Sequence, residues 1–263
     1  MAPGTDLSHD FTVGMARSLS HARLYLTSHT PRILFVHGGF HGAWCWSRTL
    51  TFLSERGVGA AAIDLRGHGG LSQGANFIAQ GVGEMTDDVT EALSTFTGPA
   101  FLAGHSLGAL VAMAAARQTK LRGLILLSPA VPAGMSTRHA LPRFDQDRVV
   151  APPTEARARK WFLSGGDAVD ATAYCARLCP ESPRLLNDCF HDGVAIEPGE
   201  LDCPIFCLSG RKDDSPLHRA NQDQAIAARF GARLHVVAAS GHCSMLDDGW
   251  REAADVIHGW ISA

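Results

Sequence analysis

A serine between two glycines is the residue of this chain best placed to do chemistry. Gly104-His105-Ser106-Leu107-Gly108 follows a short apolar run and precedes a run of small apolar residues. A strand that turns sharply into a helix at a G-x-S-x-G motif exposes the serine at the tip of the turn. The flanking glycines leave room for that reversal. The pattern predicts Ser106 as a nucleophile at a helix N-terminus, the alternative being a glycine-rich turn with a passive serine.

A serine hydroxyl is a poor nucleophile and needs a base, which in turn needs an acid that orients it. For a serine on such a turn, the expected order along the chain is serine, acid, histidine. His242 comes directly after the apolar run 233–238, and we expect it to be the base. Asp213 and Asp214 both follow the apolar run 204–209. We favour Asp213 as the acid and interpret Asp214 as a solvated turn residue.

The reaction also needs backbone N–H groups that stabilise negative charge on the substrate oxygen. We expect one such group from Leu107, directly after the nucleophile. The other is expected in the turn His37-Gly38-Gly39-Phe40, which follows the apolar run 32–36. Gly39 is the preferred donor, because a residue without a side chain lets backbone and substrate approach closely. The alternative is that these glycines only make a tight turn.

The positions of these residues depend on elements that alternate along the chain. The apolar runs at 32–36, 58–64, 100–104, 121–128, 204–209 and 233–238 are expected to be strands. The segments at 44–56, 83–96, 109–117, 216–230 and 250–261 are expected to be helices. This alternation predicts an α/β fold with a mostly parallel central sheet flanked by helices, in a single domain over 1–263.

The alternation stops between about 131 and 200, where prolines and bulky residues replace strand-like runs. A structureless loop of that length is improbable in a compact domain, so we expect a helical lid inserted over the sheet. Phe40, His41 and Trp161 are the candidates for contact with the substrate. The bulky residues of this segment indicate a small to medium, partly apolar substrate, although at least half of them must pack on the core: Trp161, Phe162, Tyr174, Leu178, Leu185, Leu186 and Phe190.

Composition narrows the class of protein. The chain has 263 residues, 46% hydrophobic and 19% charged, with a formal net charge of −3, which argues against disorder and against nucleic-acid binding. No run approaches the ~20 apolar residues of a membrane span, and residues 1–30 lack the apolar core of a signal peptide. The odd count of seven cysteines is typical of free thiols in a reducing compartment, so we expect a cytoplasmic protein.

Thirteen histidines raise the question of a metal site. The pairs Cys175/Cys179 and Cys203/Cys207 have a spacing of three intervening residues, and no histidine stands at ligand spacing beside either pair. We therefore expect ordinary thiols, no metal and no cofactor. The expected partner is a small-molecule ester, bound by a monomer or a homodimer.

Taken together, the motifs resemble those of the α/β-hydrolase superfamily: HGG at 37–39, DLRGHG at 64–69, GHSLG at 104–108, GRKD at 210–213 and SGH at 240–242. The segment HGGFHGAWCW at 37–46 resembles the plant methylesterase and hydroxynitrile lyase branch, whereas DLRGHG looks like general bacterial-type esterases. Lyases of that branch carry Thr and Lys where this chain has Gly38 and Cys243. The resemblance thus implies ester hydrolysis instead of cyanohydrin cleavage.

The resulting hypothesis is a serine hydrolase that cleaves a carboxylic ester through an acyl-enzyme. Ser106 would attack, His242 would take its proton, and Asp213 would stabilise the imidazolium. Three alternatives stay open, because fold and triad do not determine the substrate. They are a thioesterase or lactonase, a carbon–carbon bond hydrolase or cyclase of a biosynthetic pathway, and a ligand receptor with negligible turnover.

Overall fold

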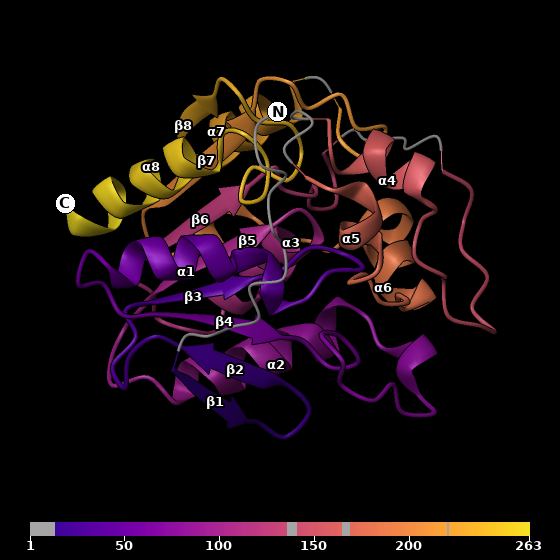
Figure 1. Ribbon diagram of the computed structural model, residues 1–263, viewed down its shortest axis with the longest axis horizontal. Coiled ribbons are helices and arrows are strands. Elements are labelled where there is room, and N and C mark those ends of the chain that lie inside the picture. The colour runs from indigo at the N-terminus through magenta and orange to yellow at the C-terminus, as the bar shows by residue number, and fades with distance from the viewer. Residues whose placement is uncertain (1–13, 136–140, 165–168, 220) are drawn as a thin grey trace.

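The computed structural model describes residues 14–135, 141–164, 169–219 and 221–263. Its strands in chain order are β1 (Met15–Ser18), β2 (Arg23–Leu26), β3 (Ile33–Val36), β4 (Ala60–Asp64), β5 (Phe101–His105), β6 (Gly123–Leu127), β7 (Ile205–Gly210) and β8 (Arg233–Val237). Within this part of the chain they form one eight-stranded sheet in the order β1-β2-β4-β3-β5-β6-β7-β8 (Figure 1). Strands β3 to β8 pair in parallel, and β1 and β2 are antiparallel, so the expected mostly parallel sheet is confirmed.

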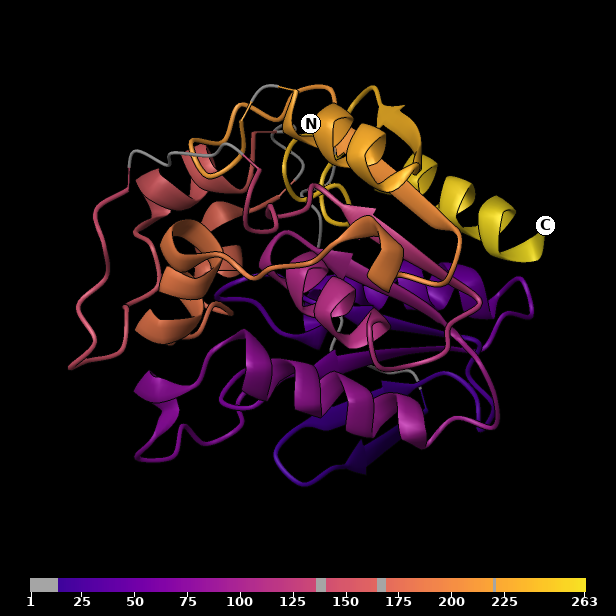
Figure 2. The same cartoon turned by 180° about the vertical axis from the view of Figure 1, so that it is seen from behind.

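Helices cover both faces of the sheet. On one face lie α1 (Ser47–Ser54) and α8 (Trp250–Ser262), and on the other lie α2 (Val82–Ser94), α3 (Leu107–Ala116) and α7 (Gln222–Phe230) (Figures 1 and 2). Strands covered on both faces are apolar throughout instead of alternating, which is why β3, β4, β5 and β6 are buried at every residue. Helix α3 is also buried at every residue, and its alanines let it lie close against the sheet.

The strand register determines which loops begin as neighbours at the edge of the sheet where the candidate site lies. Val36 at the end of β3 pairs with Gly104 of β5, so the turns after these two strands begin side by side. Gly210 at the end of β7 pairs with Val237 at the end of β8. The loops that carry Asp213 and His242 therefore leave the same edge of the sheet as neighbours.

Two features differ from the sequence-based expectation. The hairpin of β1 and β2 was not expected, because each strand has only four residues and shows too little alternation to stand out. The helix expected from residue 216 begins only at Gln222. Asn221 before it has a left-handed backbone with φ 64°, and an α-helix does not continue through such a residue.

The described residues between β6 and β7, at 128–135, 141–164 and 169–204, are called the insert below. They contain three short helices, α4 (Glu155–Trp161), α5 (Ala171–Cys175) and α6 (Pro183–Asn187), a π-helical turn at Asp188–Asp192 and a 3₁₀ turn at Pro198–Glu200. The three helices lie together beyond one end of the sheet (Figure 1). Among the described helices, none is both long and apolar enough to cross a membrane.

Candidate active site

Ser106 occupies a strained turn between β5 and α3. Its backbone has φ 52° and ψ −119°, a conformation that a non-glycine residue keeps only when its surroundings hold it. A Cβ atom on Gly104 would lie 2.4 Å from the Gly108 carbonyl oxygen, and one on Gly108 would lie 2.1 Å from that of His37. The strand, turn and helix around the G-x-S-x-G motif are thus as the sequence predicts, and the two glycines are a steric requirement.

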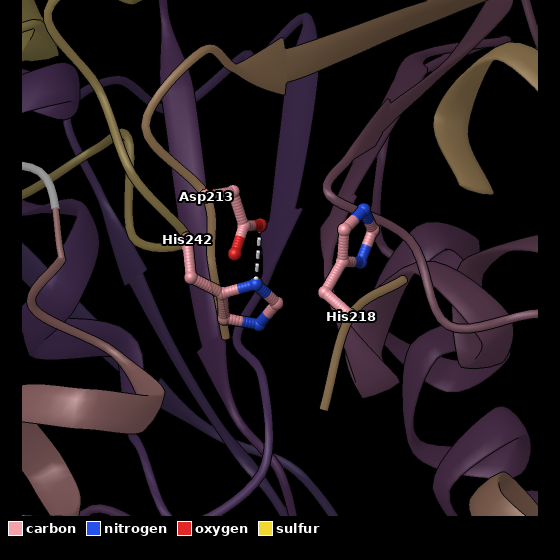
Figure 3. A group of neighbouring side chains, drawn as sticks. All are labelled: Asp213, His218 and His242. Carbon is pink, nitrogen blue, oxygen red and sulfur yellow. Dashed lines mark hydrogen bonds and ion pairs between the residues drawn. The ribbon is translucent and has the colours of Figure 1, made fainter. Parts of the chain in front are cut away.

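The structure brings the predicted nucleophile, base and acid together. His242 Nε2 lies 3.1 Å from Ser106 Oγ, and His242 Nδ1 lies 2.8 Å from Asp213 Oδ2. Figure 3 shows the second of these bonds. The side chains of His242 and Asp213 are only 1% and 3% exposed. Asp214 is exposed to solvent, so the geometry distinguishes between the two aspartates that the sequence left open.

The hydrogen bonds determine which ring nitrogen of His242 is basic. A carboxylate only accepts, so the Nδ1 that faces Asp213 carries the hydrogen and Nε2 is free to accept from the Ser106 hydroxyl. Burial by itself would raise the pKa of Asp213, but the neighbouring His242 outweighs it and the pKa is lowered. The Ser215 N–H donates to the other oxygen of Asp213, at 3.1 Å. The Asp213 carboxylate is therefore held ionised and directed toward His242 Nδ1.

A second acid–histidine pair lies beside the first. The rings of His218 and His242 are 5.5 Å apart, and Figure 3 shows His218 near the Asp213 carboxylate. His218 Nε2 lies 3.0 Å from Asp223 Oδ1, and Nδ1 accepts from the Gln222 amide at 3.1 Å. Burial would lower the pKa of His218, but Asp223 raises it more. His218 is 8% exposed, so this second pair is buried like the first.

Three of these residues have the spacing of a metal site. Ligand atoms of Asp213, His218 and His242 all lie within 4.8 Å of one another. Each side chain already has protein partners, however: His242 lies between Asp213 and Ser106, and His218 lies between Gln222 and Asp223. A metal ion would have to displace the two hydrogen bonds of His242 and the His218–Asp223 ion pair.

The two expected oxyanion donors also lie side by side. A Cβ atom on Gly39 would be 3.6 Å from Leu107 Cδ1, so the turn after β3 lies against the first residue of α3. The N–H groups of the first helical turn have no acceptor within the helix. The Gly38 carbonyl accepts from His37 Nδ1 at 2.8 Å. Because the two ends of a peptide unit point in opposite directions, the Gly39 N–H is directed away from His37.

The three candidates for substrate contact have different environments. His41 is 1% exposed, with Nδ1 at 2.7 Å from the Gly39 carbonyl oxygen and Nε2 at 2.6 Å from the Tyr174 hydroxyl. Burial lowers its pKa to about 4, so the ring is neutral at pH 7. Phe40 is also buried, and Trp161 is partly buried against Phe162. Both nitrogens of His41 are thus engaged by the protein.

Phe162 is the aromatic residue of the insert that lies against the base. Its ring is stacked on His242, with centroids 6.3 Å apart and an interplanar angle of 30°. In the sequence it is one of several bulky residues of the insert, and nothing in its spacing separates it from Trp161. Only tertiary packing determines which of these two neighbours reaches His242.

Known proteins and a family model match this chain over most of its length. The model of the alpha/beta hydrolase family matches residues 33–256. An esterase of Mycobacterium tuberculosis, Rv0045c, is 34% identical over 262 residues, which cover 87% of this chain and 82% of that protein. A putative chloroplastic methylesterase 15 of Arabidopsis thaliana is 47% identical over 49 residues, and there the match spans 19% of this chain and only 11% of the plant protein.

A solved structure supports the fold over nearly the whole length. The methylesterase MES16 of Arabidopsis superimposes with a TM-score of 0.73 at 21% identity, over 89% of this chain and 99% of that one. At this level of identity the superposition establishes the fold alone. The family model and the mycobacterial relative extend over most of the chain, and the residues that the family model matches include all the motifs of the site. The chain therefore belongs to the alpha/beta hydrolase family.

Proposed function

We propose that this protein is a serine hydrolase that cleaves a carboxylic ester of a small to medium, partly apolar substrate. The observation that carries the proposal is the hydrogen-bonded series from Asp213 through His242 to Ser106, with distances of 2.8 and 3.1 Å. A serine bonded to a base that is itself oriented by an acid is the arrangement that activates a hydroxyl for acyl transfer. The relatives named esterase and methylesterase support the same reaction.

The reaction follows from the positions of these groups. Ser106 Oγ attacks the acyl carbon while His242 Nε2 takes the hydroxyl proton, and the N–H groups of Gly39 and Leu107 stabilise the oxyanion. His242 then gives the proton to the departing alcohol, which leaves an acyl group on Ser106. Water activated by the same nitrogen of His242 attacks that acyl group and releases the acid. Asp213 stabilises the imidazolium in both halves of the reaction.

The insert serves in this proposal as the lid over the site. Phe162 against His242 and Phe40 beside it supply apolar surface next to the nucleophile, which suits the partly apolar substrate. Trp161, which packs on Phe162, is kept as a candidate for substrate contact. We place the protein in a reducing compartment such as the cytoplasm because all seven cysteines are free thiols, and we expect a monomer or a homodimer.

A hydrolysis panel tests the proposed function. It comprises short and medium acyl esters, aryl methyl esters, lactones and thioesters, each assayed with the wild type and with Ser106→Ala. We expect hydrolysis of at least one carboxylic ester class, a burst of alcohol equal to the enzyme concentration where deacylation is slow, and loss of both in Ser106→Ala. Wild-type turnover by Ser106→Ala would contradict the proposal. Ligand binding without turnover of any panel member would favour the receptor alternative.

A further inference from the structure

The insert forms hydrogen bonds with the loop that carries the expected oxyanion donor Gly39. The Cys179 N–H donates to the Phe40 carbonyl oxygen at 2.9 Å, and the Phe40 N–H donates to Glu181 Oε2, also at 2.9 Å. Both backbone polar groups of Phe40 are therefore bonded by one short segment of the insert. Phe40 has a left-handed backbone with φ 65°, which is rare for a bulky residue and persists only where the surroundings impose it.

The peptide unit between Gly39 and Phe40 is held at both of its ends. At one end the Phe40 N–H donates to Glu181, and at the other the Gly39 carbonyl accepts from His41 Nδ1 at 2.7 Å. Since His41 Nδ1 carries the hydrogen of that bond, its Nε2 accepts from the Tyr174 hydroxyl of α5 at 2.6 Å. Glu181 directly, and Tyr174 through His41, thus hold this peptide at its two ends, and it is the neighbour of the Gly38–Gly39 peptide that carries the Gly39 N–H.

Glu181 is itself anchored deep in the protein. Its side chain is fully buried, and its two oxygens accept from the N–H groups of Phe40 and Ser182 and face His68 Nε2 at 3.0 Å. His68 belongs to the DLRGHG loop after β4, and its Nδ1 donates to the Arg66 carbonyl at 2.8 Å. Burial would lower the pKa of His68, but the facing Glu181 raises it more, which favours a buried ion pair.

A buried carboxylate is costly unless its charge is paired and all its bonds are made, and apolar residues of similar volume would serve packing as well. Here Glu181 Oε2 joins the insert to two loops beside the site, through the Phe40 N–H and His68, while Oε1 accepts from Ser182 within the insert. We propose that Glu181 is a positioning residue that, together with Tyr174 acting through His41, orients the Gly39 N–H toward the substrate oxyanion. This inference rests on the proposed function, because it presupposes that Gly39 is an oxyanion donor.

The first test is Glu181→Gln, which keeps size and shape. Two carboxylate oxygens serve three N–H groups, whereas an amide has one oxygen and one NH₂ group, so at least one donor must then face another donor. We expect kcat to fall by at least about tenfold, toward the ~10²–10³ typical of a lost oxyanion donor, with KM changed by less than about twofold. The affinity for a trifluoromethyl ketone, whose adduct with Ser106 carries an oxyanion, should weaken by a similar factor.

The matched control is Glu155→Gln, an exposed glutamate of α4 that pairs with Arg159 in the same insert. It should keep wild-type kcat and inhibitor affinity. Measuring the melting temperature of each variant separates positioning from packing. If Glu181→Gln melts earlier but the folded protein keeps wild-type kcat and ketone affinity, Glu181 only stabilises the fold and the inference is overturned.

A second variant decides the matter if Glu181→Gln does not fold. Tyr174→Phe removes the hydroxyl that bonds His41 Nε2, and His41 holds the opposite end of the same peptide. This variant should lower kcat and ketone affinity together while KM is kept. Wild-type values for both quantities in Tyr174→Phe would then refute the inference. Ser106→Ala distinguishes failure of this inference from failure of the proposed function. Undiminished turnover in Ser106→Ala would refute the function itself, whatever the other variants do.

Discussion

Replacing Asp213 by asparagine isolates the electrostatic part of the proposed mechanism. The carboxylate lies 2.8 Å from His242 Nδ1, which places the centres of the two charged groups about 4 Å apart when the imidazolium forms. At an effective dielectric constant of about 20, that attraction amounts to roughly 4 kcal/mol. One factor of ten in rate corresponds to about 1.4 kcal/mol, so losing the charge should cost about 10³-fold in turnover.

The amide adds a second loss. Its NH₂ group is able to donate to His242 Nδ1, which would move the ring hydrogen to Nε2 and leave that atom unable to accept from Ser106. We therefore expect Asp213→Asn to lower kcat/KM by roughly 10³–10⁴-fold, as for a triad whose histidine takes the wrong tautomer. The folded structure should survive, because asparagine has the same shape as aspartate.

The assay is hydrolysis of whichever ester the panel identifies, with Asp214→Asn as the matched control. Asp214 is exposed, so its variant should keep kcat/KM within about twofold of wild type. Circular dichroism and the melting temperature verify that both variants are folded. If a folded Asp213→Asn retained a tenth of wild-type activity, or if Asp214→Asn were the variant that lost it, the assignment of the acid would be refuted.

Three further predictions concern stability. Gly104→Ala places a Cβ atom 2.4 Å from a backbone oxygen, so it should lower the free energy of unfolding, measured with urea, by at least about 2 kcal/mol. Gly83→Ala has open space around its Cβ atom and should leave that free energy unchanged or raise it. Equal effects of the two substitutions would contradict the steric argument. The pKa of His41 is about 4 in the folded protein and about 6.5 in the unfolded chain, so the unfolded chain binds a proton first on acidification. The stability that the neutral ring contributes above pH 6.5 is therefore lost at lower pH, about 2 kcal/mol by pH 5. Between pH 7 and pH 5, the free energy of unfolding of His41→Gln should fall by about 2 kcal/mol less than that of the wild type. The raised pKa of His218 gives the opposite pH dependence, because the stability from its pair with Asp223 is present below pH 6.5 and is lost as the pH rises. Asp223→Asn should therefore lower the free energy of unfolding more at pH 6 than at pH 9.

The catalytic candidates could be located from sequence because the fold itself gathers them. Ser106 follows β5 directly, Asp213 and His242 come within five residues after β7 and β8, and the carboxyl ends of parallel strands meet at one edge of a sheet. Residue types favour Asp213 but leave Asp214 as an alternative, and the hydrogen bond of Asp213 to His242 supports the first. Two adjacent residues of a loop differ in direction, and the direction depends on turn geometry that residue types do not specify.

The residues that support the site could not be located in this way. Glu181 and Phe162 lie in segments without the periodicity of a strand or a long helix, and His218 lies where the sequence predicts a helix that begins only at Gln222. The partners of Glu181 and Phe162 come from segments distant in sequence, as Glu181 shows by bonding Phe40 across 141 residues. The charged character of Glu181 even favours an exposed position, because a lone carboxylate is rarely buried. Three N–H donors, from Phe40, Ser182 and His68, make the buried position of Glu181 favourable. They surround the carboxylate only in the packed structure, so the sequence does not show them.

Several of the thirteen histidines hold the backbone of the loops around the site. Four buried rings each donate an N–H to a backbone carbonyl beside the site: His37 to Gly38, His41 to Gly39, His68 to Arg66 and His105 to His242. A site at the edge of a sheet is built from loops, whose backbone groups lack the ladder of partners that strands have. Imidazole is compact, and burial keeps three of these rings neutral, with the pKa values of His37, His41 and His105 all lowered. The neutral rings of His37 and His41 each use one donor and one acceptor, so each joins two chain segments without the cost of a buried charge, whereas His68 accepts that cost to hold Glu181.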